Sequence, residues 1–215
     1  MQRIFMSMPR SLSSVSSAAC SPRAEIRRAQ VLEAAQACFQ EFGFHGASIS
    51  RICRVAGMSP GHVYHYFRNK EEIVAAIVEQ DVARILDFHE RMRNAANVTQ
   101  TLRDVVAEGV HRALEPSEVA LKLEILAEAA RNPRVAELVQ AADRRMRESL
   151  VVTLRALGSE RETEELYNCI DIMAAMFDGL MTRGVRNPEV DVENVIRCYQ
   201  KRMLELFDLD VDPAA

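Results

Sequence analysis

Residues that start and stop helices divide this chain into nine segments, and inside each segment the apolar residues recur at intervals of three and four. Ser21-Pro22 and Ser59-Pro60 each combine a capping side chain with a proline at the first helical position. Gly57 ends a segment after only two turns. No segment alternates apolar and polar residues over the length of a strand. The sequence therefore predicts an all-α fold of about nine helices, over residues 22–42, 48–56, 60–67, 69–93, 98–114, 117–131, 133–157, 161–184 and 191–208.

The second and third of these helices are short and are separated only by a turn, which is the layout of a helix-turn-helix. We expect residues 22–68 to form a compact three-helix head, and residues 69–215 to form a larger helical domain whose first helix connects the two parts. Residues 1–21 are serine-rich and are expected to be a flexible N-terminal extension. Three methionines remain alternative start sites: Met1, Met6 and Met8.

The five cysteines, at positions 20, 38, 53, 169 and 198, are odd in number and include no Cys-x-x-Cys pair. They indicate reduced thiols and hence a cytoplasmic protein. Cys53 lies between Arg51 and Arg54, whose charges would lower a thiol pKa, so a redox role for it stays open. The longest uncharged stretch, residues 55–67, is too short and too interrupted by glycine and proline for a membrane span.

The sequence carries no signature of an enzyme or of a metal site. A nucleophile elbow, a phosphate-binding loop and paired catalytic carboxylates are all missing from it. His45, His62 and His65 do not have the spacing of metal ligands. We therefore expect no enzymatic activity, no cofactor and no bound metal.

Residues 42–72 read FGFHGASISRICRVAGMSPGHVYHYFRNKEE. This segment resembles the DNA-binding domain of the tetracycline-repressor (TetR) family, whose pattern is F-G-[YF]-x-x-[AT]-[ST], a short helix, A-G-[VM]-S, G-x-[VL]-Y-x-[YH]-F and K-E-E-L. The chain meets nearly every element, with Ile73 where the family usually has leucine. The resemblance is detailed over residues 25–75 and extends to the whole chain in helix number and length. It implies a transcriptional regulator with a DNA-binding head followed by a ligand-binding and dimerisation domain.

The start of the helix expected at 60–67 is suited to contact with DNA. Gly61 removes a side chain where the backbone would approach a partner closely, and the N–H groups of the first turn favour phosphate. The major groove is wide enough to admit such a helix. The resemblance implies phosphate contacts from Ser48, Ser59, Tyr64, His65, Tyr66 and Lys70. It implies positions near the base edges for Ser50, Pro60, Gly61 and His62. For Tyr64, packing alone is the alternative.

The formal net charge of -4 argues at first against an anionic partner. The charge is unevenly distributed, however. Residues 1–70 contain nine Lys or Arg and three Asp or Glu, whereas residues 71–215 contain 18 and 28. A basic head is thus joined to an acidic domain. Because electrostatic attraction is local, over a Debye length of about 8 Å at physiological salt, the head is the end expected to face DNA.

The two late helices, 161–184 and 191–208, carry apolar faces that favour a four-helix bundle between two subunits. Gly179 costs about 1 kcal/mol in a helix interior relative to alanine, which suggests that another helix approaches it closely. The faces comprise Ile172, Met176, Gly179 and Leu180 on the first helix, and Val192, Val195, Tyr199, Met203 and Leu206 on the second. Ordinary packing within one chain is the alternative.

Methionine and aromatic residues in the larger domain suggest an adaptable apolar pocket for a small effector. The candidates are Phe88, Met92, His111, Met173 and Phe177, with Ile170 and Met181 beside them. Plain core packing is the alternative for each. Asp104, Glu108 and Glu124 would favour a cationic group if they faced inward.

Together, these features predict a ligand-responsive repressor. It would bind double-stranded DNA at a palindromic operator as a homodimer, and a small, largely apolar effector would release it. An activator of the same fold and a helical interaction module that has lost DNA binding are the alternatives. The last would leave the YHYF segment and its basic neighbours unexplained.

Overall fold

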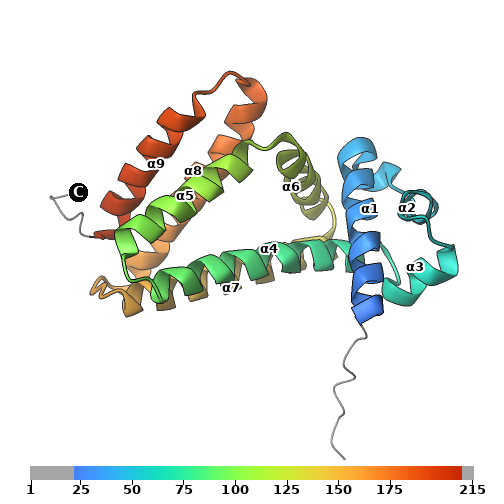
Figure 1. Cartoon of the computed structure of the whole chain (residues 1–215), viewed down its shortest axis with the longest axis horizontal. Helices are drawn as coiled ribbons and strands as arrows, with labels where there is room; N and C mark the ends of the chain where they lie inside the picture. Colours follow the sequence, from blue (N-terminus) through green and yellow to red (C-terminus); the bar gives the residue numbers. More distant parts are fainter. Residues whose placement is uncertain (1–21, 210–215) are drawn as a thin grey trace, which may run out of the picture.

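The computed structural model describes residues 22–209. The extension predicted at 1–21, with Cys20 and the alternative start sites, lies outside the described residues. Within the described part the chain forms nine α-helices and no strand, which confirms the predicted all-α fold (Figure 1). None of these helices is both long and apolar enough to cross a membrane. They are α1 (Pro22–Gly46), α2 (Ile49–Ala56), α3 (Pro60–Tyr66), α4 (Lys70–Arg93), α5 (Val98–Leu114), α6 (Pro116–Ala129), α7 (Pro133–Ala156), α8 (Thr163–Arg186) and α9 (Val192–Phe207).

Side-chain caps begin several helices where the sequence predicts them. The Ser48 hydroxyl accepts a hydrogen bond from the Arg51 N–H at 3.2 Å, and the Asn69 side chain accepts one from the Glu72 N–H at 2.8 Å. Gly57 ends α2 with a φ of 63°, a left-handed conformation that glycine adopts without steric cost. Because these signals are local, the other helix limits lie within a few residues of their predicted positions.

The first helix departs from its predicted end at Phe42. Gly43 has φ 69° and ψ 170°, so α1 kinks there and then continues for one more turn to Gly46. On that turn Phe44 is buried and stacks on Phe39, with the ring centroids 5.6 Å apart, whereas Phe42 is exposed. Burial of the Phe44 ring offsets the helical hydrogen bonds lost at the kink.

Helices α1, α2 and α3 form a head at one end of the molecule, and α4 leads from it along the second domain (Figure 1). α7 packs along α4, and α5 packs against both α8 and α9. α6 stands between that group and the head, in contact with α1 and α7. The head therefore rests on the second domain mainly through α4 and α6.

The residues of the head alone do not complete its hydrophobic core. Val63 and Phe67 are buried in the same apolar cluster as Ile73 and Val74 from the start of α4, and Val135 from α7 completes that cluster. A second cluster occupies the interior among α5, α7, α8 and α9. The head core consequently depends on the positions of both α4 and α7.

A buried polar cluster joins α4 to α7. His89 is 8% exposed, and its Nδ1 lies 2.9 Å from the Ser149 Oγ. Arg93 donates a hydrogen bond to the Thr153 Oγ1, and that hydroxyl donates one to the Ser149 carbonyl. Burial, with a smaller contribution from the Arg93 guanidinium, lowers the pKa of His89 to about 4. His89 is therefore neutral in the folded protein at pH 7.

We expect the free energy of unfolding to fall by about 2 kcal/mol between pH 7 and pH 5 on account of His89. Its folded-state pKa lies below the unfolded value, so its stabilisation is present above about pH 6.5 and is lost as the pH falls toward 4. Urea unfolding at both pH values measures the effect. The fall should shrink by that amount in His89→Gln but not in His65→Gln, at an exposed position; equal falls in wild type and His89→Gln would refute the assignment.

Candidate DNA-binding site and regulatory surfaces

The helix-turn-helix is built from α2, a turn at Gly57-Met58, and α3. Ile52 on α2 and Val63 on α3 are completely buried, and Phe67 directly after α3 is nearly so. These side chains hold the inner faces of both helices against the head core. The outer face of α3 is left in solvent, as a recognition helix requires.

Eight of the ten predicted DNA-contacting residues are exposed in the structure: Ser48, Ser50, Ser59, Pro60, Gly61, His62, Tyr64 and His65. Tyr64 is 52% exposed, so it is not held in place by packing alone. Tyr66 is half-buried, and its ring meets the His65 ring edge-on with centroids 5.0 Å apart. The structure brings these residues together around one surface; their individual contacts with DNA stay a prediction.

The hydroxyl groups of Ser48 and Ser59 can each cap a helix and contact a phosphate. The Ser48 Oγ accepts the Arg51 N–H, and the Ser59 Oγ accepts the His62 N–H at 3.4 Å. A serine hydroxyl has a donor as well as acceptor lone pairs, so the O–H of each capping serine remains available for a phosphate oxygen. The same residue can therefore start the helix and contact the DNA backbone.

Lys70, unlike the exposed predicted contacts, is half-buried and hydrogen-bonded within the head. Its Nζ donates a 2.6 Å hydrogen bond to the Phe44 carbonyl and lies 4.3 Å from the centre of the Phe44 ring. Burial lowers the pKa of Lys70, and the nearby Glu128 and Glu71 carboxylates oppose that shift. In this structure Lys70 holds the last turn of α1 in place, so its ammonium is only partly available to a phosphate.

The sequence pattern predicted no DNA contact for the arginines of the head. Arg51 and Arg54 both lie on α2, the helix that crosses the DNA backbone in this motif. Arg54 is exposed, and the Arg51 guanidinium lies 3.7 Å from the centre of the Phe42 ring. The basic balance of residues 1–70 was the signal that could have identified them as phosphate contacts.

The Cys53 thiol is buried, and burial raises its pKa. The neighbouring Arg51 and Arg54 do not overcome this effect. A raised pKa leaves little thiolate at pH 7, so the structure argues against the redox role that the sequence left open. Within residues 22–209 there is no group of three or more His, Cys, Asp or Glu side chains placed to hold a metal ion.

The residues predicted to line an effector pocket do not all lie together. Phe88 and Met92 are buried and Met173 and Phe177 are half-buried, but His111 is exposed, which corrects its assignment to an interior pocket. The histidine lies on the outer side of α5 because the apolar stripe of that helix faces α8 and α9.

The Phe177 ring fills the space beside Gly109 of α5. A Cβ at Gly109 would lie only 3.0 Å from the Phe177 ring, and that ring also meets the Tyr199 ring at 5.3 Å between centroids. Two pockets, of about 430 and 400 Å³, lie elsewhere, one at the end of α9 and one between α1, α3 and α4. None of the predicted effector residues lines either pocket.

The acidic residues considered for a cationic effector have other partners. Glu108 accepts two hydrogen bonds from Arg91, which lower its pKa. Glu124 accepts the Phe44 N–H at 3.1 Å, and Asp104 accepts a hydrogen bond from Gln100. These contacts do not support the assignment of a cation site to the three carboxylates.

The predicted dimer faces of α8 and α9 are only partly exposed. Leu180 and Met203 are buried in the core of their own chain, which corrects their assignment to the interface. Their helices are apolar over a wide arc, and the inner part of that arc packs against α5. Outside it, Ile172 and Gly179 are exposed, and Met176, Val195 and Tyr199 are half-buried. The Tyr199 hydroxyl donates to the Met176 carbonyl.

The fold and the exposed helix-turn-helix define a DNA-binding protein of the helix-turn-helix class. Residues 31–77 match the family model described as bacterial regulatory proteins, tetR family, and residues 98–205 match the one described as BetI-type transcriptional repressor, C-terminal. The chain belongs to the TetR family of transcriptional regulators.

The similarity to individual members of the family extends over most of the chain. The regulator UidR of Escherichia coli K12 is 33% identical over 178 residues, which cover 81% of this chain and 86% of UidR. Salmonella enterica GusR has the same fold, with a TM-score of 0.69, 24% identity, and coverage of 87% and 98%. Bacillus subtilis FadR, solved with stearoyl-CoA, has a TM-score of 0.66, 18% identity, and coverage of 80% and 95%. The family comprises transcriptional regulators and not enzymes, which confirms that prediction.

Gly61→Ala should weaken DNA binding without harming the fold. A methyl group at this position would meet no atom within 4 Å, so the free energy of unfolding should stay the same or rise by up to about 1 kcal/mol. If the backbone at Gly61 approaches DNA, operator affinity should fall about tenfold. Fluorescence anisotropy with a labelled duplex measures this, with Val152→Ala, 59% exposed on α7 of the second domain, as the control. Full affinity in Gly61→Ala would remove Gly61 from the interface.

Proposed function

We propose that the chain is a dimeric repressor that binds a palindromic operator and is released by a small, largely apolar effector. The observation that carries the proposal is the solvent-exposed face of α3, which Val63 and Phe67 anchor from behind. A rigidly held helix with capping hydroxyls at its start, on the basic end of the chain, is suited to the major groove.

The dimer would form through α8 and α9 of each subunit. Ile172 is 52% exposed, and a Cβ at Gly179 would meet no atom within 4 Å, so both positions have room for a neighbouring helix. A two-fold arrangement would set the two α3 helices about 34–36 Å apart, in successive major grooves. That spacing is the geometric reason to expect a palindrome.

The effector would enter between α5 and α8, where Phe177 rests on Gly109. Displacing the half-buried Phe177 ring would open an apolar site beside Met92 and Met173, which belong to the same apolar cluster. The complex of FadR with stearoyl-CoA, a ligand with a long apolar chain, supports this class of effector. Such a ligand must bind the conformation that does not bind DNA more tightly, because equal affinity for both would shift nothing.

The deciding experiment is selection of bound duplexes from genomic fragments, followed by a screen for compounds that release the recovered operator. We expect a palindromic sequence with two half-sites about one helical turn apart. Transcription from a promoter that carries this operator should fall when the protein is present and recover with the compound. Recovery of no sequence above background would contradict the proposed function, and increased transcription would replace the repressor with an activator.

Ile172→Glu should separate the subunits. Association through this face would bury an unpaired carboxylate in each subunit, so the dissociation constant of the dimer should rise by at least about a hundredfold. Sedimentation equilibrium measures it. Val55→Glu is the matched control, because Val55 is 53% exposed but lies on the head. A dimer equally stable in both variants would exclude this face of α8 from the interface.

A further inference from the structure

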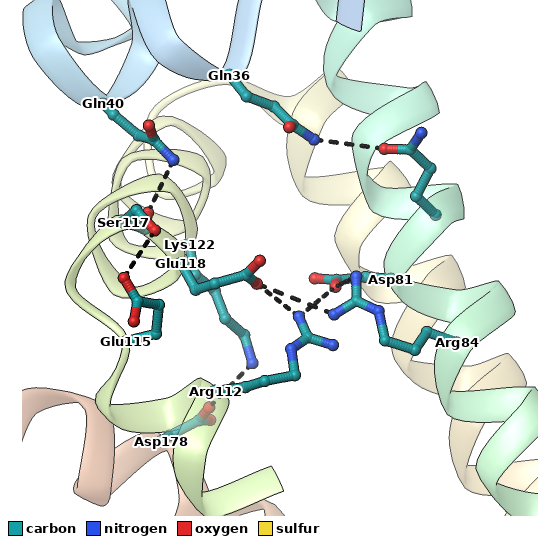
Figure 2. Close-up of polar contacts among 11 residues, drawn as sticks. Gln36, Gln40, Asp81, Arg84, Arg112, Glu115, Ser117, Glu118, Lys122 and Asp178 are labelled. Atoms are coloured by element: carbon teal, nitrogen blue, oxygen red, sulfur yellow. Dashed lines mark hydrogen bonds and ion pairs between the residues drawn. The ribbon is translucent and has the colours of Figure 1, made fainter. Parts of the chain in front are cut away.

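The helix α1 of the head touches the second domain through two glutamines one turn apart (Figure 2). The Gln36 Nε2 donates to the Gln80 Oε1 on α4 at 3.3 Å, and the Gln40 Nε2 donates to the Ser117 carbonyl on α6 at 3.0 Å. The orientation of α1 therefore depends in part on how far apart α4 and α6 are held at these two points.

The residues that follow the two contact points are both acidic, and one arginine bridges them (Figure 2). Asp81 follows Gln80 on α4, and Glu118 follows Ser117 on α6. A single nitrogen of Arg112 on α5, Nη2, lies 3.2 Å from the Asp81 Oδ1 and 2.6 Å from the Glu118 Oε2. Arg112 thus links three helices at the level where α1 rests on two of them.

Arg84 also belongs to this cluster, but it contacts Glu118 less closely than Arg112 does. It lies on α4 and pairs closely with Asp81 of its own helix, at 2.7 Å, but reaches Glu118 only at 3.9 Å. Without the Arg112 charge, Arg84 alone would face both the Asp81 and the Glu118 carboxylate, so their mutual repulsion across the α4–α6 gap would be less compensated. The side chains of Arg112 and Glu118 are 30% and 46% exposed, so their attraction is partly screened but not abolished.

We propose that Arg112 is a positioning residue for DNA binding, because it fixes the separation of α4 and α6 and so the orientation of the head. The same turn of α5 carries Gly109, against which the Phe177 ring rests. An effector that displaces Phe177 acts on that turn and loosens the hold of Arg112 on Glu118. This last step rests on the proposed function; the positioning role of Arg112 does not require an effector.

The test measures the position of α1 directly. Spin labels are attached to Glu33→Cys on α1 and Glu148→Cys on α7, both exposed positions, after Cys20 and Cys198 have been replaced by serine. Labelled chains are mixed with an excess of unlabelled chains, so that distances within one chain are recorded by pulsed electron paramagnetic resonance. Operator affinity is measured in parallel on unlabelled protein with the same change at Arg112.

The chain offers a matched control for Arg112→Ala. Arg91 also ties α4 to α5, through two hydrogen bonds to Glu108 at 3.0 and 2.8 Å, and it does not contact α6 in the described structure. Arg91→Ala therefore removes a comparable ion pair and the same charge without affecting the α4–α6 separation.

We expect Arg112→Ala to broaden the distance distribution and to lower operator affinity about fivefold, with circular dichroism unchanged. Arg91→Ala should leave both the distribution and the affinity as in wild type. Arg112→Lys should retain most of the wild-type distance distribution and operator affinity. A single arginine nitrogen makes both contacts, and a lysine ammonium can do the same. Glu118→Gln should broaden the distance distribution less than Arg112→Ala, because it removes the repulsion with Asp81 together with the ion pair.

An unchanged distance distribution in Arg112→Ala would overturn the proposal, and so would equal broadening in Arg91→Ala. Broadening with full operator affinity would show that the position of α1 does not govern DNA binding, and would overturn it as well. The distance measurement needs neither an operator nor an effector. A chain that fails to recognise any operator would therefore contradict the proposed function, while the distance distributions would still show whether Arg112 positions α1.

Discussion

The packing of the start of α4 into the head is the interaction on which the rest of the structure depends. Ile73 and Val74 are completely buried beside Val63 and Phe67, and Val135 of α7 closes the same cluster. The three helices of the head have too little apolar surface of their own, so these residues of the second domain complete the core of the head. The packing of the head core therefore depends on the position of α4.

The polar contacts of α6 add a second attachment. Phe44 donates its N–H to Glu124, and the His45 Nε2 lies 3.2 Å from the buried Glu128 carboxylate. These contacts exist because Gly43 kinks α1 and turns its last residues toward α6. The head is consequently held by α4 through apolar packing and by α6 through hydrogen bonds and charges, and the Arg112 cluster sets the distance between these two supports.

Much of the DNA-binding site could be predicted from the sequence, since its signals are local. Ser59-Pro60 starts α3 and Gly57 ends α2 through interactions within a few residues, and spacing alone identifies Val63 and Phe67 as the inward side of the motif. The position of Lys70 could not be predicted in this way. Its partner, the Phe44 carbonyl, exists in that place only because α1 continues past its expected end.

The sequence by itself determined the nine helices, their approximate limits and the motif that identifies the family, because caps, prolines and apolar periodicity act within one or two turns. Only the tertiary structure decided which part of each wide apolar stripe faces inward. It buried Leu180 and Met203 in their own chain and left His111 outside. It also brought Asp81, Arg112 and Glu118 together from three helices, an arrangement set by long-range packing that no local pattern encodes.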